Sequence, residues 1–306
     1  MFRRRYSLFS MTEAAASRPY PIRLGELNEW TARHRTTSEE ARRRFVQFVV
    51  LDSFSAANIS RSLAFKGGNA LRFGHGYPRS TFDLDFSATD LEDDSATIRG
   101  IIDEAVREGS AAFEIKCKVS SVHRNPSRLD RTLPTYTVKI SYAFPGDRTF
   151  PDFFEVDTLR LPVVPIDISF NDIVCETVVV HFGSRDSHGI ELCTLNDIVA
   201  EKLRAILQQV IRNRNRPQDV YDISRAMRFD KAKLDLVKVR LYVDEKCSAR
   251  GIVFSEESFD AAIRARAEYG YDELRADLNE QFIPFDEAWR DVVALARELL
   301  VFDLLG

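Results

Sequence analysis

Hydrophobic and polar positions in the N-terminal half of the chain predict helices that alternate with short strands. Residues 37–58 begin with a Thr/Ser cap and acidic side chains, and apolar residues then recur at helical spacing. The predicted elements that follow are a buried strand at 63–66, a turn at Gly67–Gly68, a short helix at 69–74, a strand at 81–87 and a helix at 95–108 ended by Gly109.

Three later segments alternate apolar and polar side chains with a period of two. They are residues 113–119, 135–142 and 164–170. Such alternation is typical of strands in a sheet with one covered face, so we expect a mixed or antiparallel sheet here.

From residue 196 the pattern changes to helices only. Helical spacing recurs at 196–212, 217–228, 230–246, 255–267 and 283–303, and the last of these has a wide apolar stripe. The fold class that this pattern predicts is α/β, a mixed β-sheet domain with helices, followed by an all-helical C-terminal domain. We expect an N-terminal extension at 1–36, the α/β domain at 37–194 and the helical domain at 195–306.

Composition supports a soluble globular protein and excludes two other classes. The 306 residues are 44% hydrophobic and 29% charged, which is enough apolar material for a core and argues against a disordered chain. The longest apolar window, residues 45–54, is too short to span a membrane. The start of the chain has no apolar segment after its arginines, so we expect no secretory signal; Met11 is an alternative start.

The cysteines and the distribution of charge indicate the kind of protein and the kind of ligand. The cysteines lie far apart without metal-ligand spacing, which favours reduced thiols in a cytoplasmic protein: Cys117, Cys175, Cys193 and Cys247. The net charge is -4, yet residues 1–44 hold ten arginines against five glutamates, and residues 202–216 hold five basic residues and no acid. This distribution fits phosphate binding at one place rather than coating of nucleic acid.

Two carboxylates on one strand are the first candidate for chemistry. In Asp83-Leu84-Asp85-Phe86, residues two apart point to the same face, so both aspartates leave one face while Leu84 and Phe86 enter the core. Two neighbouring carboxylates repel unless a cation bridges them, and hard oxygen ligands suit Mg²⁺. Taken alone, the pair is more often a solvated strand edge than a metal site.

A glycine pair upstream of the two aspartates favours a metal site over a solvated strand edge. Lys66-Gly67-Gly68-Asn69 stands between a strand and a helix, where glycines let a phosphate approach the amides at the helix N-terminus. The sequence is neither a Walker loop nor GxGxxG, and a turn that needs positive φ is the other interpretation.

A third carboxylate, Asp167, interrupts the apolar strand at 164–170. It lies on the face opposite Ile166 and Ile168, and we favour a site over a hydrogen-bonded turn. Three carboxylates on strands around phosphate-bound Mg²⁺ are typical of in-line phosphoryl or nucleotidyl transfer.

These motifs together resemble the AbiEii/AbiGii-type nucleotidyltransferase toxins, which include the MenT toxins. The resemblance covers about residues 40–225 and rests on KGGNAL (66–71), Arg79-Ser80, DLDF (83–86), and a later lysine followed by R-x-x-D-x-x-D. It implies a nucleotidyltransferase-like sheet domain. It also implies that Gly67, Gly68 and Asn69 form the phosphate turn, that Asp83 and Asp85 bind the metal, and that Lys202 contacts the triphosphate. The match to R-x-x-D-x-x-D is Arg216, Asp219 and Asp222.

The helical half allows two interpretations of these last residues. Asp219 and Asp222, three apart, share a helix face and either pair with arginines on a solvated surface, or one of them orients Lys202 or the nucleoside. Arg212, Arg214 and Arg216 likewise either contact an RNA backbone or are solvated.

The resulting hypothesis is a Mg²⁺-dependent nucleotidyltransferase toxin with its nucleotide in a cleft between the two halves. Lys66, Arg79 and Ser80 join the glycine turn and Arg216 as expected nucleotide- or phosphate-binding residues, and Asp167 completes a second metal site or acts as base. The resemblance implies an NTP substrate, an RNA acceptor such as the tRNA 3′ end, and a cognate antitoxin. The alternatives are transfer to a small-molecule (antibiotic) or protein hydroxyl, and a nucleotide-binding module without turnover.

Overall fold

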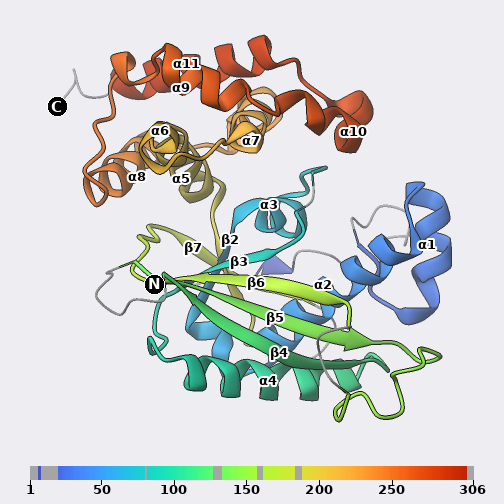
Figure 1. The fold of residues 1–306 in the computed structure, drawn as a ribbon. Helices are drawn as coiled ribbons and strands as arrows, with labels where there is room; N and C mark the ends of the chain where they lie inside the picture. The colour runs from blue at the N-terminus through green and yellow to red at the C-terminus, as the bar shows by residue number, and fades with distance from the viewer. Residues whose placement is uncertain are drawn as a thin grey trace. The chain divides into compact units, whose positions relative to one another are not determined.

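The computed structural model describes residues 6–7, 20–79, 81–126, 133–156, 161–182 and 188–301. The chain divides into two compact units, Met1–Cys193 and Thr194–Gly306. The first unit contains the sheet and the second is helical (Figure 1). The expected α/β fold with a mixed sheet and a helical C-terminal part is confirmed.

The first unit is built on one eight-stranded sheet in the order β1-β7-β8-β2-β3-β6-β5-β4. Three neighbouring pairs are parallel, namely β1 with β7, β2 with β8 and β3 with β6, and the others are antiparallel. The strands are β1 Tyr6–Ser7, β2 Leu63–Lys66, β3 Leu84–Ala88, β4 Lys116–Asn125, β5 Thr135–Ala143, β6 Val163–Ser169, β7 Thr177–His181 and β8 Ile190–Cys193.

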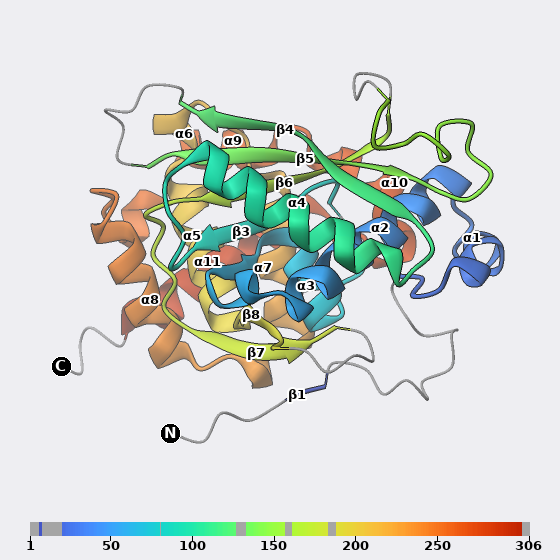
Figure 2. The ribbon, with the colours of Figure 1, turned by 90° about the horizontal axis from the view of Figure 1, so that it is seen from below.

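Helices of the first unit cover one face of this sheet. They are α1 Leu27–His34, α2 Ser38–Ala56, α3 Gly67–His75 and α4 Ser95–Ala111, with short 3-10 segments η1 Leu24–Glu26 and η2 Asn58–Arg61. Figure 2 shows α4 running across the strands with α2 beside it. Helix α2 begins as its sequence predicts, because the Thr37 side chain accepts a hydrogen bond from the Glu40 amide at 3.1 Å.

The alternation of side chains along the strands separates the buried core from the polar face. On β3 and β6 the residues Leu84, Phe86, Ile166 and Ile168 are completely buried. The Phe86 ring lies 5.6 Å from that of Phe54 on α2, so this is the face that the helices cover. The polar residues between them necessarily leave the opposite face.

Several predicted boundaries are wrong, each for a local reason. Helix α3 begins at Gly67 itself, so the glycines open the helix instead of forming a turn before it. Strand β3 begins at Leu84 rather than at 81, and Asp83 lies in the loop before it. The strand predicted at 113–119 runs over 116–125, because Glu114 has a φ of 60°, which no extended strand accepts.

Helix α4 continues through Gly109, which was predicted to end it. This glycine lies where α4 crosses α2: a Cβ on Gly109 would stand 1.9 Å from Ser53 Oγ and 2.9 Å from the Ser53 Cα. The glycine therefore permits the close approach of two helices.

Strands β7 and β8 and helix α1 are not among the predicted elements. Helix α1 lies within the segment predicted as an N-terminal extension, yet Trp30 is buried in it. Tyr20 is also buried, and its ring stacks on that of Phe73 at 4.2 Å. Residues 20–36 thus pack on the first unit, and Met11 lies outside the described residues.

The second unit is a set of helices around α5. The predicted helix at 196–212 is interrupted at Gln208, and the other predicted helices are present within shifted limits. The helices are α5 Leu195–Leu207, α6 Gln209–Arg212, α7 Pro217–Phe229, α8 Leu236–Ser248, α9 Ala261–Glu268, α10 Arg275–Leu278 and α11 Phe285–Val301. Within the described part of the chain, no helix combines the length and apolar character needed to cross a bilayer.

Two glycines of α4 give a matched test of the helix packing. Gly109→Ala should destabilise the protein by about 1–3 kcal/mol, because the new methyl group meets the backbone of α2. Gly100→Ala on the same helix meets nothing within 4 Å and should stabilise by up to about 1 kcal/mol through helix propensity. Urea unfolding followed by circular dichroism measures both; equal effects of the two substitutions would contradict the close packing.

Candidate metal and phosphate site

A row of polar side chains crosses the open face of the sheet. In the strand register, Lys66 on β2 is opposite Asp85 on β3, Asp85 is opposite Asp167 on β6, and Asp167 is opposite Thr137 on β5. Residues directly opposite each other in neighbouring strands point to the same face. The row therefore lies on the face that α2 and α4 leave uncovered.

Three carboxylates meet in this row. Asp83, from the loop before β3, joins Asp85 and Asp167, and one oxygen of each lies within 4.8 Å of the others. All three residues are half-buried, and Thr137 Oγ1 donates a hydrogen bond of 2.7 Å to Asp167 Oδ1. At that separation two unit charges repel by about 3 kcal/mol for an effective dielectric constant of 20. A divalent cation relieves this repulsion, and an all-carboxylate donor set fits Mg²⁺ or Mn²⁺.

Gly67 leaves room for the Asp85 carboxylate. Its φ is +74°, a left-handed conformation that favours glycine, and a Cβ there would stand 2.2 Å from Asp85 Oδ2. This glycine is also the first residue of α3, where main-chain amides have no partner within the helix. The carboxylates and the helix N-terminus are therefore in direct contact.

Gly68 is enclosed in the same way by the loop that follows α3. A Cβ on Gly68 would stand 2.5 Å from Thr81 Cγ2 and 2.9 Å from a terminal nitrogen of Arg79. Arg79 is 7% exposed, so a buried guanidinium lies against the first turn of α3. Ser80, the other predicted residue of this pair, lies outside the described residues.

The Asn69 side chain holds the loop that carries Asp83. It is completely buried, and its Nδ2 donates to the carbonyl oxygens of Thr81 at 3.0 Å and of Asp83 at 2.5 Å. Thr81 Oγ1 also donates to the Asp83 carbonyl, at 3.1 Å. The side chain of Asn69 is thus engaged in positioning, which leaves its main chain for the phosphate binding that the sequence predicts.

Two buried side chains of α2 hold the same loop from the other side. Gln47 Nε2 donates to the Phe82 carbonyl at 3.0 Å, and Arg44 Nη1 donates to the Thr81 carbonyl at 3.0 Å. Arg44 Nη1 also contacts Asn69 Oδ1 at 3.3 Å and Gln47 Oε1 at 2.8 Å. The carbonyl groups of residues 81–83 all accept hydrogen bonds from buried side chains, which fixes the main chain at Asp83.

The start of this loop has a similar anchor. Arg72 on α3 donates to the Pro78 carbonyl, and burial lowers the pKa of its guanidinium to about 10. At neutral pH the group is still charged, so it remains a hydrogen-bond donor only.

Lys66, predicted to bind phosphate, has an acidic partner. Its Nζ lies 2.5 Å from Asp172 Oδ2, and both side chains are mostly buried. The ion pair holds the ammonium at the end of β2, beside the row of carboxylates.

In the second unit, Lys202 lies between the two predicted aspartates. Its Nζ is 2.6 Å from Asp219 Oδ1 and 2.9 Å from Asp222 Oδ2, joining α5 to α7. All three side chains are at most 10% exposed, which contradicts the interpretation of two solvated aspartates. Arg216, at the start of α7, is a looser neighbour, with Nε 3.9 Å from Asp219 Oδ2.

A second buried pair on α5 was not predicted. Asp197 lies 3.1 Å from Lys246 of α8, and each side chain is 4% exposed. Arg212 and Arg214, predicted to contact RNA or to be solvated, are exposed at the end of α6. Helix α5 therefore carries two buried ion pairs, one toward each of its neighbours.

Sequence reasoning named the carboxylates but missed their supports. Thr137 was signalled by its place in an alternating strand, and Gln47 by its polarity within the apolar run FVQFVV. Arg44 belongs to a run of three arginines, in which nothing set it apart. Asp172 is the second residue after the third predicted strand, and no pattern marked it.

His75 and two of the cysteines lack the surroundings of catalytic residues. His75 Nε2 lies 3.1 Å from the Cys193 carbonyl. Burial raises the pKa of the Cys117 and Cys247 thiols to about 12, so both are protonated at neutral pH. Neither has the depressed pKa of a nucleophilic cysteine.

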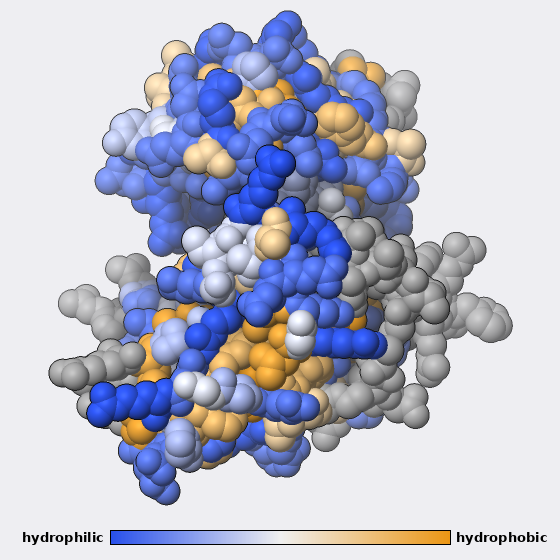
Figure 3. Space-filling model, turned by 90° about the vertical axis from the view of Figure 1, so that its right-hand side faces the viewer, coloured by the Kyte–Doolittle hydropathy of each residue, from blue (hydrophilic) through white to orange (hydrophobic). Residues whose placement is uncertain are grey.

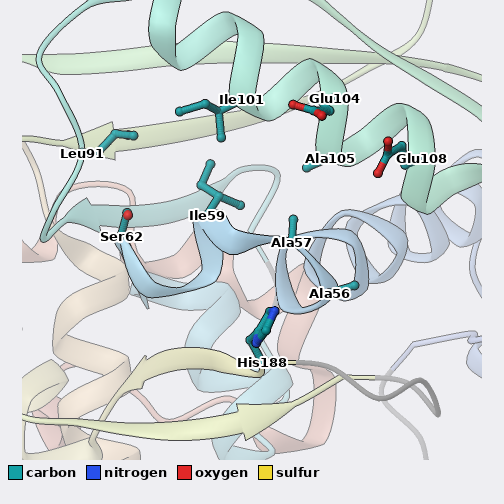
Figure 4. A pocket seen from close by; sticks show the side chains of 10 residues that line it. All are labelled: Ala56, Ala57, Ile59, Ser62, Leu91, Ile101, Glu104, Ala105, Glu108 and His188. Atoms are coloured by element: carbon teal, nitrogen blue, oxygen red, sulfur yellow. The ribbon is translucent and has the colours of Figure 1, made fainter.

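A pocket of about 500 Å³ lies elsewhere in the first unit. Figure 4 shows it between the end of α2, η2 and α4, with Glu104 and Glu108 on the α4 side and His188 opposite. Its other lining residues are small or apolar, and none of the three aspartates is among them. The pocket is therefore separate from the carboxylate site.

The chain matches the model of one known protein family over most of its length. A family model described as nucleotidyl transferase AbiEii toxin, Type IV TA system, matches residues 49–294. No curated protein matches the chain.

Two solved structures from Helicobacter pylori are similar in part. One is the JHP933 protein, with 14% sequence identity, a TM-score of 0.43, and coverage of 86% of this chain and 92% of that one. The other is a candidate nucleotidyltransferase, also with 14% identity and a TM-score of 0.43, covering 88% of this chain and 99% of that one.

The contact between Gly67 and Asp85 predicts a specific loss of metal binding. Gly67→Ala and Gly76→Ala both place alanine at a φ above +70°, which should cost each about 1–2 kcal/mol of stability. Only at residue 67 does the methyl group meet the Asp85 carboxylate; at residue 76 nothing lies within 4 Å. Gly67→Ala should therefore weaken Mn²⁺ binding about 10–100-fold, measured by electron paramagnetic resonance titration, whereas Gly76→Ala keeps the wild-type affinity. Equal affinities in the two variants would contradict the assignment.

Proposed function

Because the chain belongs to the AbiEii nucleotidyltransferase toxin family, which makes it a nucleotidyltransferase toxin of a toxin–antitoxin system, we propose that it transfers a nucleotide from an NTP to an RNA acceptor. The observation that carries this proposal is the meeting of Asp83, Asp85 and Asp167 beside the first glycine of α3. The family also implies an antitoxin as protein partner. The tRNA 3′ end is the acceptor that we propose.

Mg²⁺ is the proposed cofactor, and the three aspartates are its proposed ligands. Their oxygens suit a hard cation, and Gly67 keeps the space around Asp85 open. When bound, the ion would neutralise charge on the phosphates of the NTP and on the attacking and leaving oxygens.

The proposed reaction is an in-line displacement at the α-phosphorus of the NTP. The acceptor hydroxyl oxygen forms a bond to that phosphorus, the bond to the β-phosphate oxygen breaks, and pyrophosphate leaves. Asp167 takes the hydroxyl proton, and the hydrogen bond from Thr137 keeps its carboxylate oriented.

The phosphates of the NTP are proposed to lie at the N-terminus of α3. The amides of Gly68 and Asn69 and the positive end of the helix dipole favour a polyanion there. Arg79 adds a cation against Gly68, and Lys66 with its partner Asp172 borders the carboxylate row. These groups would stabilise the charge that develops on pyrophosphate as it leaves.

Lys202, Asp219 and Asp222 are proposed as the second functional element. Two carboxylates hold the Lys202 side chain in place, so it is oriented before any substrate binds. We propose that Lys202 contacts the triphosphate, with Asp219 and Asp222 as its positioning residues and Arg216 as a further phosphate contact.

Labelled NTPs supplied singly with total tRNA and Mg²⁺ test the function. Wild-type protein should label the RNA and release pyrophosphate. Asp83→Asn should reduce the rate on the order of a hundredfold or more, because a charge-stabilising group is lost. Asp90→Asn, an exposed aspartate of the same unit, should react as the wild type.

Other outcomes of this assay contradict the proposal. Wild-type rates in Asp83→Asn would remove the role of that carboxylate. Label on a protein or an aminoglycoside but not on RNA would establish the alternative acceptors, and NTP binding without any transfer would indicate a non-catalytic module.

Two buried lysines, Lys202 of α5 and Lys246 of α8, separate function from stability in the second unit. Lys202→Met and Lys246→Met each remove the ammonium that lies against buried carboxylates and should each cost about 3–5 kcal/mol in urea unfolding. At a temperature where circular dichroism shows both variants folded, only Lys202→Met should lose nucleotide transfer. Asp219→Asn, which keeps Asp222 as partner, should lose less stability and still react slowly. A parallel loss of activity in both lysine variants would reduce Lys202 to a structural residue.

A further inference from the structure

An exposed phenylalanine stands next to a proposed metal ligand. Phe82 directly precedes Asp83 and is 50% exposed, whereas Phe65 and Phe86 on the neighbouring strands are completely buried. Figure 3 shows a face on which hydrophobic residues of the first unit reach the surface between hydrophilic ones. Other phenylalanines of the chain are also exposed, and what distinguishes Phe82 is its place next to a proposed metal ligand.

Phe82 is held firmly despite its exposure. Gln47 fixes its carbonyl at 3.0 Å, and the Arg43 guanidinium carbon lies 4.5 Å from the centre of its ring. Arg43 is itself paired with Glu40 on the preceding turn of α2. The ring therefore has a cation on one side and is fixed at its backbone before any ligand arrives.

We propose that Phe82 and Arg43 form a stacking site for a nucleobase of a substrate that reacts at the three aspartates. Every nucleobase has a flat π-face that stacks on an aromatic ring, and an arginine on the other side strengthens the arrangement. Phe82 directly precedes Asp83, and the carbonyl groups of both residues are held by buried side chains, of Gln47 and Asn69 respectively, so the ring stands on the same fixed loop as a proposed metal ligand.

The proposal rests on the proposed function, since it names how that function's substrates are held. The base has two sources: the incoming NTP, or the terminal residue of the RNA acceptor. Both would use the same stacking chemistry, and binding measurements with each ligand distinguish them.

The chain provides a matched control for this site. Phe154 is 43% exposed, and the guanidinium carbon of Arg107 lies 4.6 Å from its ring centre. It resembles Phe82 in exposure and in its arginine neighbour, but it lies in the connection between β5 and β6 and adjoins none of the aspartates. Any general effect of removing an exposed phenylalanine should appear in both.

The experiment compares Phe82→Ala, Phe82→Trp and Phe154→Ala in the full chain with Mg²⁺ present. Isothermal titration calorimetry measures the dissociation constants of an NTP, of a short RNA oligonucleotide and of inorganic tripolyphosphate, which has no base. Phe82→Ala should weaken the binding of the NTP or of the RNA about tenfold or more, the ligand affected being the source of the base. Tripolyphosphate should bind all variants equally, Phe82→Trp should retain base binding, and Phe154→Ala should match the wild type.

Two results would overturn the proposal. One is unchanged binding of both base-containing ligands by Phe82→Ala. The other is an equal loss for tripolyphosphate, which would show that Phe82 only shapes the loop. Failure of the proposed function gives a different result. If base binding depends on Phe82 but the wild type transfers no nucleotide, the stacking site is supported and the transfer reaction is contradicted. Transfer by the wild type with unchanged binding in Phe82→Ala contradicts stacking alone.

Discussion

The repulsion among three carboxylates on one sheet face is the constraint on which this structure depends. Oxygens of Asp83, Asp85 and Asp167 lie within 4.8 Å of one another, at a cost of about 3 kcal/mol for each ionised pair. A sheet tolerates such a cluster only where its backbone is fixed and a cation can balance the charge. The fixation comes from a buried network, in which Asn69 and two residues of α2 bind the carbonyl groups of the loop before β3.

Three consecutive arginines of α2 show how one helix serves this arrangement. Arg42 pairs with Asp147 and lies over the Phe144 ring at 4.2 Å, at the end of β5. Arg43 lies over Phe82, and Arg44 reaches into the loop before β3. Successive helical residues point about 100° apart, so each arginine meets a different part of the first unit. The excess of positive charge at the start of the chain is thus used partly for internal contacts rather than for a free basic surface.

Much of this arrangement could be predicted from the sequence because its signals are periodic. The alternation along β6 predicted that Asp167 and Ile166 point to opposite faces of the sheet. The two-residue spacing of Asp83 and Asp85 predicted that they lie together, and they do so although Asp83 lies outside β3. What failed depended on contacts between distant segments. Glycine often ends a helix, and Gly109 was predicted to do so. It lies inside α4 instead, because α2 approaches too closely there for a side chain. Asn69 has the position of a phosphate ligand, and only the fold shows that its side chain binds the loop at 81–83. The partners of Lys202 were named, but their burial was not predictable from spacing.

The central claim is that the three aspartates share a divalent cation at the start of α3. A crystal of the full chain grown with Mn²⁺ and a non-hydrolysable NTP, measured at the manganese absorption edge, tests it most directly. The account predicts an anomalous peak about 2.1 Å from oxygens of Asp83, Asp85 and Asp167, with phosphates of the nucleotide at the amides of Gly68 and Asn69. Manganese held by other residues, or a nucleotide bound away from this turn, would contradict it.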